Sequence, residues 1–321
     1  MEAGAQAQWL SHFAPKITAR LNAAAPGSTL VDEDIPMLMA LCSFESLAHY
    51  QTSKWCNVFY EEEWRDFEYW SDLEKYYNTG LGNPLGRVQG VGWVNELIAR
   101  LTHTPVNDTT TTNRTLDEDP ETFPIGKNVT MFADFSHDNE MNAIFAAMGL
   151  FRMAEVTDER TRTWENAIVE QGGSGILASL ASIEEQGDEL SNARRRSKKE
   201  MDPDHPDPNR QWVASRLVPF AARLVIEKLE CYVPDTTATF VEQPAYWGHS
   251  ATGMNTTEAV RVLLNDAVVH IPGCAASEKQ LGSGVCALDV FLETQSYARS
   301  GGAGEWEGCQ KESHEGERET M

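Results

Sequence analysis

The period of the apolar residues changes within residues 129–151, and this change constrains the fold more than any other feature of the chain. Residues 129–135 (VTMFADF) form a short apolar run typical of a buried strand. The following residues, HDNEMNAIFAAMGLF, place apolar side chains three or four apart and predict a helix. Residues 136–139 (SHDN) therefore fall at a strand-to-helix junction. In an open α/β sheet such junctions bind ligands, and a helix N-terminus attracts anions.

Helical patterns dominate the first hundred residues. Apolar residues recur at helical spacing over 8–23, 31–49 and 60–78, which predicts three amphipathic helices. Residues 80–92 (GLGNPLGRVQGVG) are rich in glycine and predict an irregular segment. A further helix is expected over residues 93–103 (WVNELIARLTH), and Pro105 stops it.

The remaining chain is predicted to alternate between surface segments and short elements. Residues 107–123 are Thr-rich and predict a loop, and residues 152–215 predict a charged surface excursion with a weak helix around 176–200. The basic run at 194–199 is interpreted as a solvated helix face rather than an interaction patch. Pro219 is expected to open a helix over FAARLVIEKLEC, and residues 259–271 predict a hairpin that turns at Asn265-Asp266. The last twenty residues predict a loose tail.

The acidic composition argues against two classes of partner. A formal net charge of -23 repels nucleic acid and anionic membranes. No stretch approaches the ~20 consecutive apolar residues that a membrane helix needs. An anionic substrate would require local Arg, Lys and His to overcome the global field.

Cysteines and glycosylation sequons indicate an oxidising, extracellular compartment. The six Cys contain no C-x-x-C pair, which is a poor pattern for zinc and compatible with disulfides. Asn107, Asn113, Asn128 and Asn255 each begin an N-x-T sequon. The first residues do not form a signal peptide, so we expect the gene product to begin upstream of Met1.

His137 and Asp138 are the best candidates for chemistry. An acid at a helix N-terminus beside a phosphate could serve as a proton donor, and His137 could bind a phosphate oxygen. The structural alternative is a capping Asp and a partly buried His. Lys75 and Tyr77 end a helix just before the glycine-rich segment, where they could line a pocket or pack against the core.

Five segments carry a resemblance to one family. They are NPLGRVQGVGWVNELIARLTHTPV (83–106), MFADFSHDNEMNAIFAAMGLF (131–151), VPFAARL (218–224), VRVLLNDAVVHIPGC (260–274) and YARSGGAGEWEGC (297–309). Together they resemble fungal phytases, which are histidine acid phosphatases, and the resemblance departs mainly at 152–215.

The resemblance implies an α/β histidine phosphatase (phosphoglycerate mutase-like) fold with a smaller α-helical domain, its N-terminal part missing here. Residues 1–105 would form the mostly helical domain and the return to the sheet. Residues 106–151 and 216–309 would form the α/β domain, with 152–215 as an insertion and 310–321 as a flexible tail.

Residue roles also follow from the resemblance. Asp138 would protonate the leaving oxygen of a phosphomonoester, expected to be phytate, and His137 would contact the phosphate. Asn139, Lys75 and Tyr77 would lie against the substrate. The family uses no metal and no organic cofactor, and we expect a secreted monomer.

The family's other half-site, R-H-G-x-R-x-P, does not occur in this sequence, which contains no Arg-His dipeptide. In the family its His attacks phosphorus to form phosphohistidine, and its Arg residues clamp the phosphate. One hypothesis is therefore that the chain is part of a hydrolase whose nucleophile lies upstream. Another is a non-catalytic fragment or pseudoenzyme, and a broad-specificity acid phosphatase is the alternative for the substrate.

The resemblance pairs Cys42 with Cys56 and Cys274 with Cys286. The family partners of Cys231 and Cys309 would lie upstream, so these two cysteines are expected to lack their partners here. A sheet without its upstream strands is also expected to expose an unpaired edge.

Overall fold

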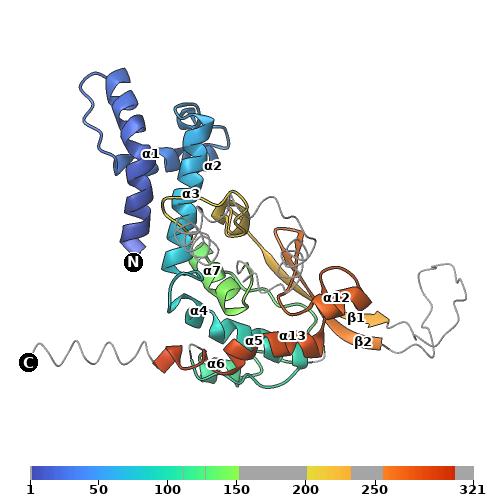
Figure 1. Ribbon diagram of the computed structural model, residues 1–321. Helices are drawn as coiled ribbons and strands as arrows, with labels where there is room; N and C mark the ends of the chain where they lie inside the picture. Colours follow the sequence, from blue (N-terminus) through green and yellow to red (C-terminus); the bar gives the residue numbers. More distant parts are fainter. Residues whose placement is uncertain (1, 111, 127, 152–200, 233–255, 308–321) are drawn as a thin grey trace, which may run out of the picture. The chain divides into compact units, whose positions relative to one another are not determined.

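The computed structural model describes residues 2–110, 112–126, 128–151, 201–232 and 256–307 of the 321-residue chain (Figure 1). The described residues form two compact units, one containing residues 2–78 and 201–213 and the other containing residues 79–110, 112–126, 128–151, 214–232 and 256–307. The predicted helix at 176–200, the basic run at 194–199 and the tail at 310–321 lie outside the described residues. The predicted division of the chain at residue 105 stays a prediction. None of the described helices is long and apolar enough to cross a membrane.

The first unit is built from helices. α1 (Glu2–Ala24), α2 (Asp34–His49) and α3 (Glu61–Asn78) confirm the three predicted helices, and a 3-10 turn η1 (Lys54–Asn57) lies between α2 and α3. Trp9 and Phe13 of α1 are buried at helical spacing. The Trp9 indole donates a hydrogen bond to the carbonyl of Asp66 at 2.8 Å and meets the Tyr69 ring edge-on. Aromatic burial of this kind holds α1 against α3.

In the second unit, helices α4 (Gly86–Gln89), α5 (Val91–Thr102), α6 (Arg114–Asp117) and α7 (Asp138–Ala147) precede the sheet, and a short α11 (Ala214–Leu217) leads into it. α5 and α7 confirm two predicted helices, whereas α4 is a short helix within the segment expected to be irregular. α7 packs against α4 and α5. At Gly90 an added Cβ would lie 2.4 Å from the Ala143 carbonyl oxygen, so only glycine permits this approach.

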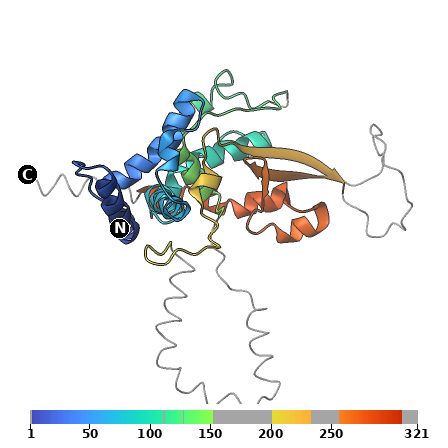
Figure 2. The same ribbon diagram turned by 90° about the horizontal axis from the view of Figure 1, so that it is seen from above.

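A small antiparallel sheet forms the other part of this unit. Its central strand is β2 (Thr256–Leu264), which pairs with β1 (Leu224–Tyr232) on one side and with β3 (Ala267–Val269) and β4 (Val285–Ala287) on the other. Helices α12 (Ala275–Leu281) and α13 (Leu288–Thr294) lie beside these strands, and a short α14 (Ser296–Arg299) follows (Figure 2). Helices and sheet together confirm the predicted α/β class. No described strand pairs with the outer edge of β1.

The helix predicted to follow Pro219 is wrong, because these residues form β1. Its register with β2 runs unbroken from Leu224 opposite Leu264 to Tyr232 opposite Thr256. Leu, Glu and Lys favour helices, but the segment is too short and too weakly periodic to resist pairing. Nine residues of ladder hydrogen bonding and cross-strand contacts decide its conformation.

The predicted hairpin turn at Asn265-Asp266 is confirmed. Both residues have positive φ angles, 50° and 68°, as a two-residue turn between β2 and β3 requires. The Asn265 side chain accepts a hydrogen bond from the Arg223 N–H at 3.0 Å and donates to the Arg216 carbonyl at 2.7 Å. The turn therefore also fixes the start of β1.

The buried strand predicted at 129–135 is wrong. The structure has no strand there, and Met131 and Phe135 are 81% and 100% exposed. A strand needs a neighbouring backbone to satisfy its N–H and C=O groups, and none of the described strands pairs with this segment. The motif therefore follows an unpaired segment rather than the carboxyl end of a sheet strand.

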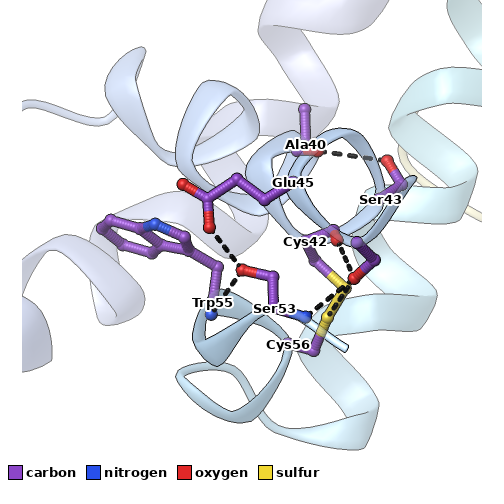
Figure 3. The surroundings of a disulfide bond; sticks show 8 residues. Ala40, Cys42, Ser43, Glu45, Ser53, Trp55 and Cys56 are labelled. Atoms are coloured by element: carbon purple, nitrogen blue, oxygen red, sulfur yellow. Dashed lines mark hydrogen bonds between the residues drawn. A yellow bond between two sulfur atoms is a disulfide. The ribbon is translucent and has the colours of Figure 1, made fainter. Parts of the chain in front are cut away.

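Both predicted disulfides are confirmed. Cys42 is bonded to Cys56, and Cys274 is bonded to Cys286. Beside the first, Ser53 accepts a hydrogen bond from the Trp55 N–H at 3.1 Å and donates to Glu45 at 2.6 Å (Figure 3). Cys231 of β1 is unpaired in the described chain, and Cys309 lies outside it.

Candidate active site

The His137-Asp138-Asn139 motif opens α7. His137 is the N-cap residue with extended backbone angles, φ -125° and ψ 169°, and Asp138 is the first helical residue. The first backbone hydrogen bond of the helix runs from the Met141 N–H to the His137 carbonyl at 3.0 Å. The N–H groups before Met141 precede the helical ladder, which gives this end a partial positive charge.

All three motif side chains lie at the surface. The His137 side chain is 87% exposed, and its Nδ1 atom lies 3.8 Å from a carboxylate oxygen of Glu140. The Asp138 carboxylate accepts a hydrogen bond from the Asn139 N–H at 2.9 Å. The structural alternative of a partly buried histidine is therefore wrong. An exposed acid and imidazole at a helix N-terminus can meet an anionic substrate and exchange protons with it.

Below its first turn, α7 is buried on nearly every side. Residues 142–147 are all buried, and Phe145 is fully enclosed. Asn142 is also fully buried, and neither side-chain amide atom has a hydrogen-bond partner in the part of the chain that the structure describes. The helix thus anchors the motif through its lower turns while the first turn stays accessible.

The segment leading into the motif is attached to α5 through Asp134. Its carboxylate accepts a hydrogen bond from the Trp93 indole at 3.0 Å and forms an ion pair with Arg100. Burial alone would raise the pKa of Asp134, but the hydrogen bond and charge of Arg100 hold it below its usual value. The Arg100 guanidinium also covers the Phe132 ring, with its carbon 5.1 Å from the ring centre.

Glu96 lies one turn before Arg100, and its pKa lies above the usual value for a glutamate. Burial, followed by the charge of Asp117, raises the pKa of Glu96 to about 7, although Arg100 at 3.5 Å opposes the shift. These attachments of the motif segment were not predicted from the sequence. The spacing of Trp93, Glu96 and Arg100 shows that these three side chains share one helix face, but no sequence pattern points to Asp134.

The predicted substrate residues Lys75 and Tyr77 lie in the first unit, in the last turn of α3. The Lys75 ammonium lies 3.6 Å from Glu74, and its side chain is 14% exposed. The Tyr77 hydroxyl donates to the Met201 carbonyl at 2.8 Å. Tyr77 therefore has a structural contact, and substrate binding by either residue stays a prediction.

Other predicted sites are placed more briefly. Asn107, Asn113 and Asn128 are exposed, and Asn255 lies outside the described residues. Within the described chain, no group of three or more His, Cys, Asp or Glu side chains could hold a metal ion.

Comparison with known proteins decides the family. Residues 3–265 match the histidine phosphatase superfamily (branch 2). The chain belongs to this family. It is 35% identical to Phytase A of Aspergillus oryzae over 309 residues, 37% identical to Phytase A of Aspergillus fumigatus over 307, and 36% identical to Phytase A of Neurospora crassa over 321. These alignments cover 94–95% of this chain and 51–55% of the relatives.

The resemblance to fungal phytases is thus confirmed, and the chain spans about half the length of the curated relatives that it matches.

Proposed function

We propose that the protein to which this chain belongs is a phosphomonoester hydrolase that releases phosphate from phytate. The observation that carries the proposal is the exposed His-Asp-Asn motif at the N-terminus of α7, in a member of the histidine phosphatase superfamily. The names of the relatives, all Phytase A, support phytate as the substrate.

Asp138 is the proton donor in this proposal. When the phosphorus–oxygen bond of the ester breaks, the alcohol oxygen gains negative charge, and a positioned acid neutralises it. General acid catalysis of this kind contributes typically ~10²–10⁴-fold to a rate. His137 and the α7 N-terminus contribute positive charge toward the phosphate, and Asn139 contacts the substrate beside them.

The attacking group is assigned to a histidine outside these 321 residues. Phosphoryl transfer depends on positioning and charge stabilisation, and a covalent route also needs a nucleophile. The R-H-G-x-R-x-P motif is not among the residues of this chain. The same observation favours the second candidate, a non-catalytic fragment or pseudoenzyme, if no such motif is joined to it.

The test measures phosphate release from phytate and from p-nitrophenyl phosphate at acidic pH. It compares the product of the whole gene with the 321-residue chain, and each with Asp138→Asn. Asp289→Asn is the matched control, because Asp289 is an exposed aspartate in the first turn of α13 whose carboxylate accepts a hydrogen bond from the next N–H at 2.8 Å, as that of Asp138 does. We expect Asp138→Asn to lower kcat on phytate by ~10²–10⁴-fold and Asp289→Asn to leave it nearly unchanged.

The two substrates sharpen the result. A p-nitrophenolate leaving group is stable without a proton, so Asp138→Asn should cost much less activity on p-nitrophenyl phosphate than on phytate. Equal losses on both substrates would contradict the proton-donor role. If the whole gene product releases no phosphate from either substrate, the hydrolase proposal is wrong and the non-catalytic hypothesis is favoured.

We also propose that the protein is a secreted glycoprotein acting as a monomer. The sequons at Asn107, Asn113 and Asn128 lie on exposed positions, and the two disulfides suit an oxidising compartment.

A further inference from the structure

A hollow of about 430 Å³ lies between the C-terminal end of α5, the loop after it and α14, all within the second unit. This volume falls within the range of roughly 300–1,000 Å³ found for small-molecule sites. Its apolar wall comes from Ile98, Ala99 and Pro105, and its polar wall from Ser296, Arg299 and Ser300. The active-site motif takes no part in the lining.

Asn107, the first residue of an N-x-T sequon, is itself part of the lining. α5 ends at His103, which has a left-handed φ of 55°, and the Thr104 N–H bonds back to the Ala99 carbonyl at 3.2 Å. The chain therefore turns back along the last two turns of α5. This reversal brings Asn107 to the wall of the hollow.

Asp108, the next residue, holds Asn107 in this position. Asp108 is only 6% exposed. Its carboxylate accepts hydrogen bonds from the Asn95 amide at 2.8 Å, from the Thr110 N–H at 2.8 Å and from the Thr112 hydroxyl at 2.7 Å. Burial would raise the pKa of Asp108, but these hydrogen bonds together lower it, so the carboxylate stays charged and bonded. These hydrogen bonds to Asp108 therefore fix the backbone position of its neighbour Asn107.

Hydrogen bonds also hold the lining residues Asn95 and Arg299 in place. Asn95 also donates to the Ala298 carbonyl at 3.1 Å, which ties α5 to α14. Arg299 donates through one nitrogen to the Leu292 carbonyl at 3.1 Å, and a guanidinium carries five N–H donors in all. An apolar wall facing hydroxyl and guanidinium donors fits a sugar ring, which has apolar faces and hydroxyl edges.

We propose that Asn107 carries an N-linked glycan and that the first N-acetylglucosamine of this glycan occupies the hollow. Attachment at the wall gives the sugar an effective concentration in the millimolar range or above. A free anion has no such advantage, because it must approach a protein of net charge -23.

The other described sequons do not lie at the hollow. Asn113 caps α6 by accepting a hydrogen bond from the Thr115 N–H at 3.1 Å, and neither it nor Asn128 lines the hollow. The proposal does not depend on hydrolase activity.

The first experiment determines occupancy and its effect on stability. The chain is secreted from yeast behind a cleavable leader, and peptide mass spectrometry measures the modification of Asn107. One portion is then trimmed with endoglycosidase H, which leaves one N-acetylglucosamine, and another with peptide N-glycosidase, which removes the whole glycan. If the first sugar fills the hollow, trimming leaves Tm unchanged and complete removal lowers it.

Matched variants isolate the sugar at Asn107. Thr109→Ala and Thr130→Ala each remove the exposed threonine of one sequon, at Asn107 and Asn128 respectively. We expect Thr109→Ala to lower Tm by about 2–4 °C, which corresponds to roughly 1 kcal/mol for a unit of this size, and Thr130→Ala to leave Tm unchanged. Arg299→Ala should lower Tm in the glycosylated chain and have a smaller effect in the Thr109→Ala background.

Two results would overturn the proposal. One is an unmodified Asn107 in the secreted chain. The other is an Arg299→Ala effect of the same size with and without the glycan, which would mean that the sugar lies outside the hollow. Hydrogen exchange over residues 296–300 gives a second measurement, since a seated sugar must slow exchange in α14 and an unseated sugar must not.

Discussion

Replacing Asn142 by leucine should stabilise the protein. Asn142 is completely buried in α7, and both its amide oxygen and its amide nitrogen lack a hydrogen-bond partner in the described chain. A buried polar group without a partner costs about 1–3 kcal/mol. Leucine has the same number of side-chain heavy atoms in the same branched arrangement, removes both unsatisfied groups and favours helices more than Asn. The free energy of unfolding should therefore rise by about 1–3 kcal/mol.

Urea denaturation followed by circular dichroism measures this change, with Asn95→Leu as the matched control. Asn95 is 4% exposed and lies on α5, but its amide donates to Asp108 and to the Ala298 carbonyl. The same substitution there leaves a buried carboxylate with fewer donors and should lower the free energy of unfolding by about 1–3 kcal/mol. If Asn142→Leu destabilises the chain as Asn95→Leu does, the amide of Asn142 is bonded in solution, and the reasoning is refuted.

Three further changes have defined outcomes. The raised pKa of Glu96, about 7 against an ordinary 4.5, means that its contribution to stability is greatest below pH 4.5 and declines as the pH rises through 7. Glu96→Gln should flatten the stability profile between pH 5 and 8 in thermal melts, and an unchanged slope would contradict this. Replacing both Cys42 and Cys56 by alanine should lower the free energy of unfolding by ~3 kcal/mol, because the bridge closes a loop of 14 residues; an unchanged urea midpoint would argue otherwise. Asn265→Ala should cost about 2 kcal/mol, since it strains a left-handed position and removes the bond to the Arg223 N–H, whereas Asn265→Gly should cost less because it relieves the strain.

The helices could be predicted because their signal is local. In α1, α3, α5 and α7 the apolar residues repeat every three or four positions, and the structure places helices over each pattern. The hairpin turn was equally local, since Asn265-Asp266 tolerates positive φ. The sequence likewise placed His137 and Asp138 at a helix N-terminus.

The failures concern elements whose conformation depends on distant partners. Residues 224–231 carry helix-forming side chains, yet β2 pairs with them along their whole length. Residues 129–135 have the composition of a strand, but the described chain provides no strand beside them, and Phe135 lies fully exposed. Local composition could not reveal that β2 lies beside residues 224–231, or that no described strand lies beside residues 129–135.

The contact between Trp93, Arg100 and Asp134 escaped prediction for the same reason. Asp134 is separated from Arg100 by 34 residues, and no periodic pattern links them. Only the reversal of the chain after α5 brings the carboxylate to the guanidinium.

The first turn of α7 is exposed and the rest of the helix is buried. This division determines how strongly a substitution at each position affects stability. Substitutions at residues 137–140 alter charge and hydrogen bonding at the surface without disturbing packing. Substitutions at residues 142–147 disturb the buried turns of α7 that support the exposed turn. Random substitution should therefore cost less stability at residues 137–140 than at residues 142–147. A library restricted to residues 137–140 should therefore keep more folded members than a library of the same size at residues 142–147.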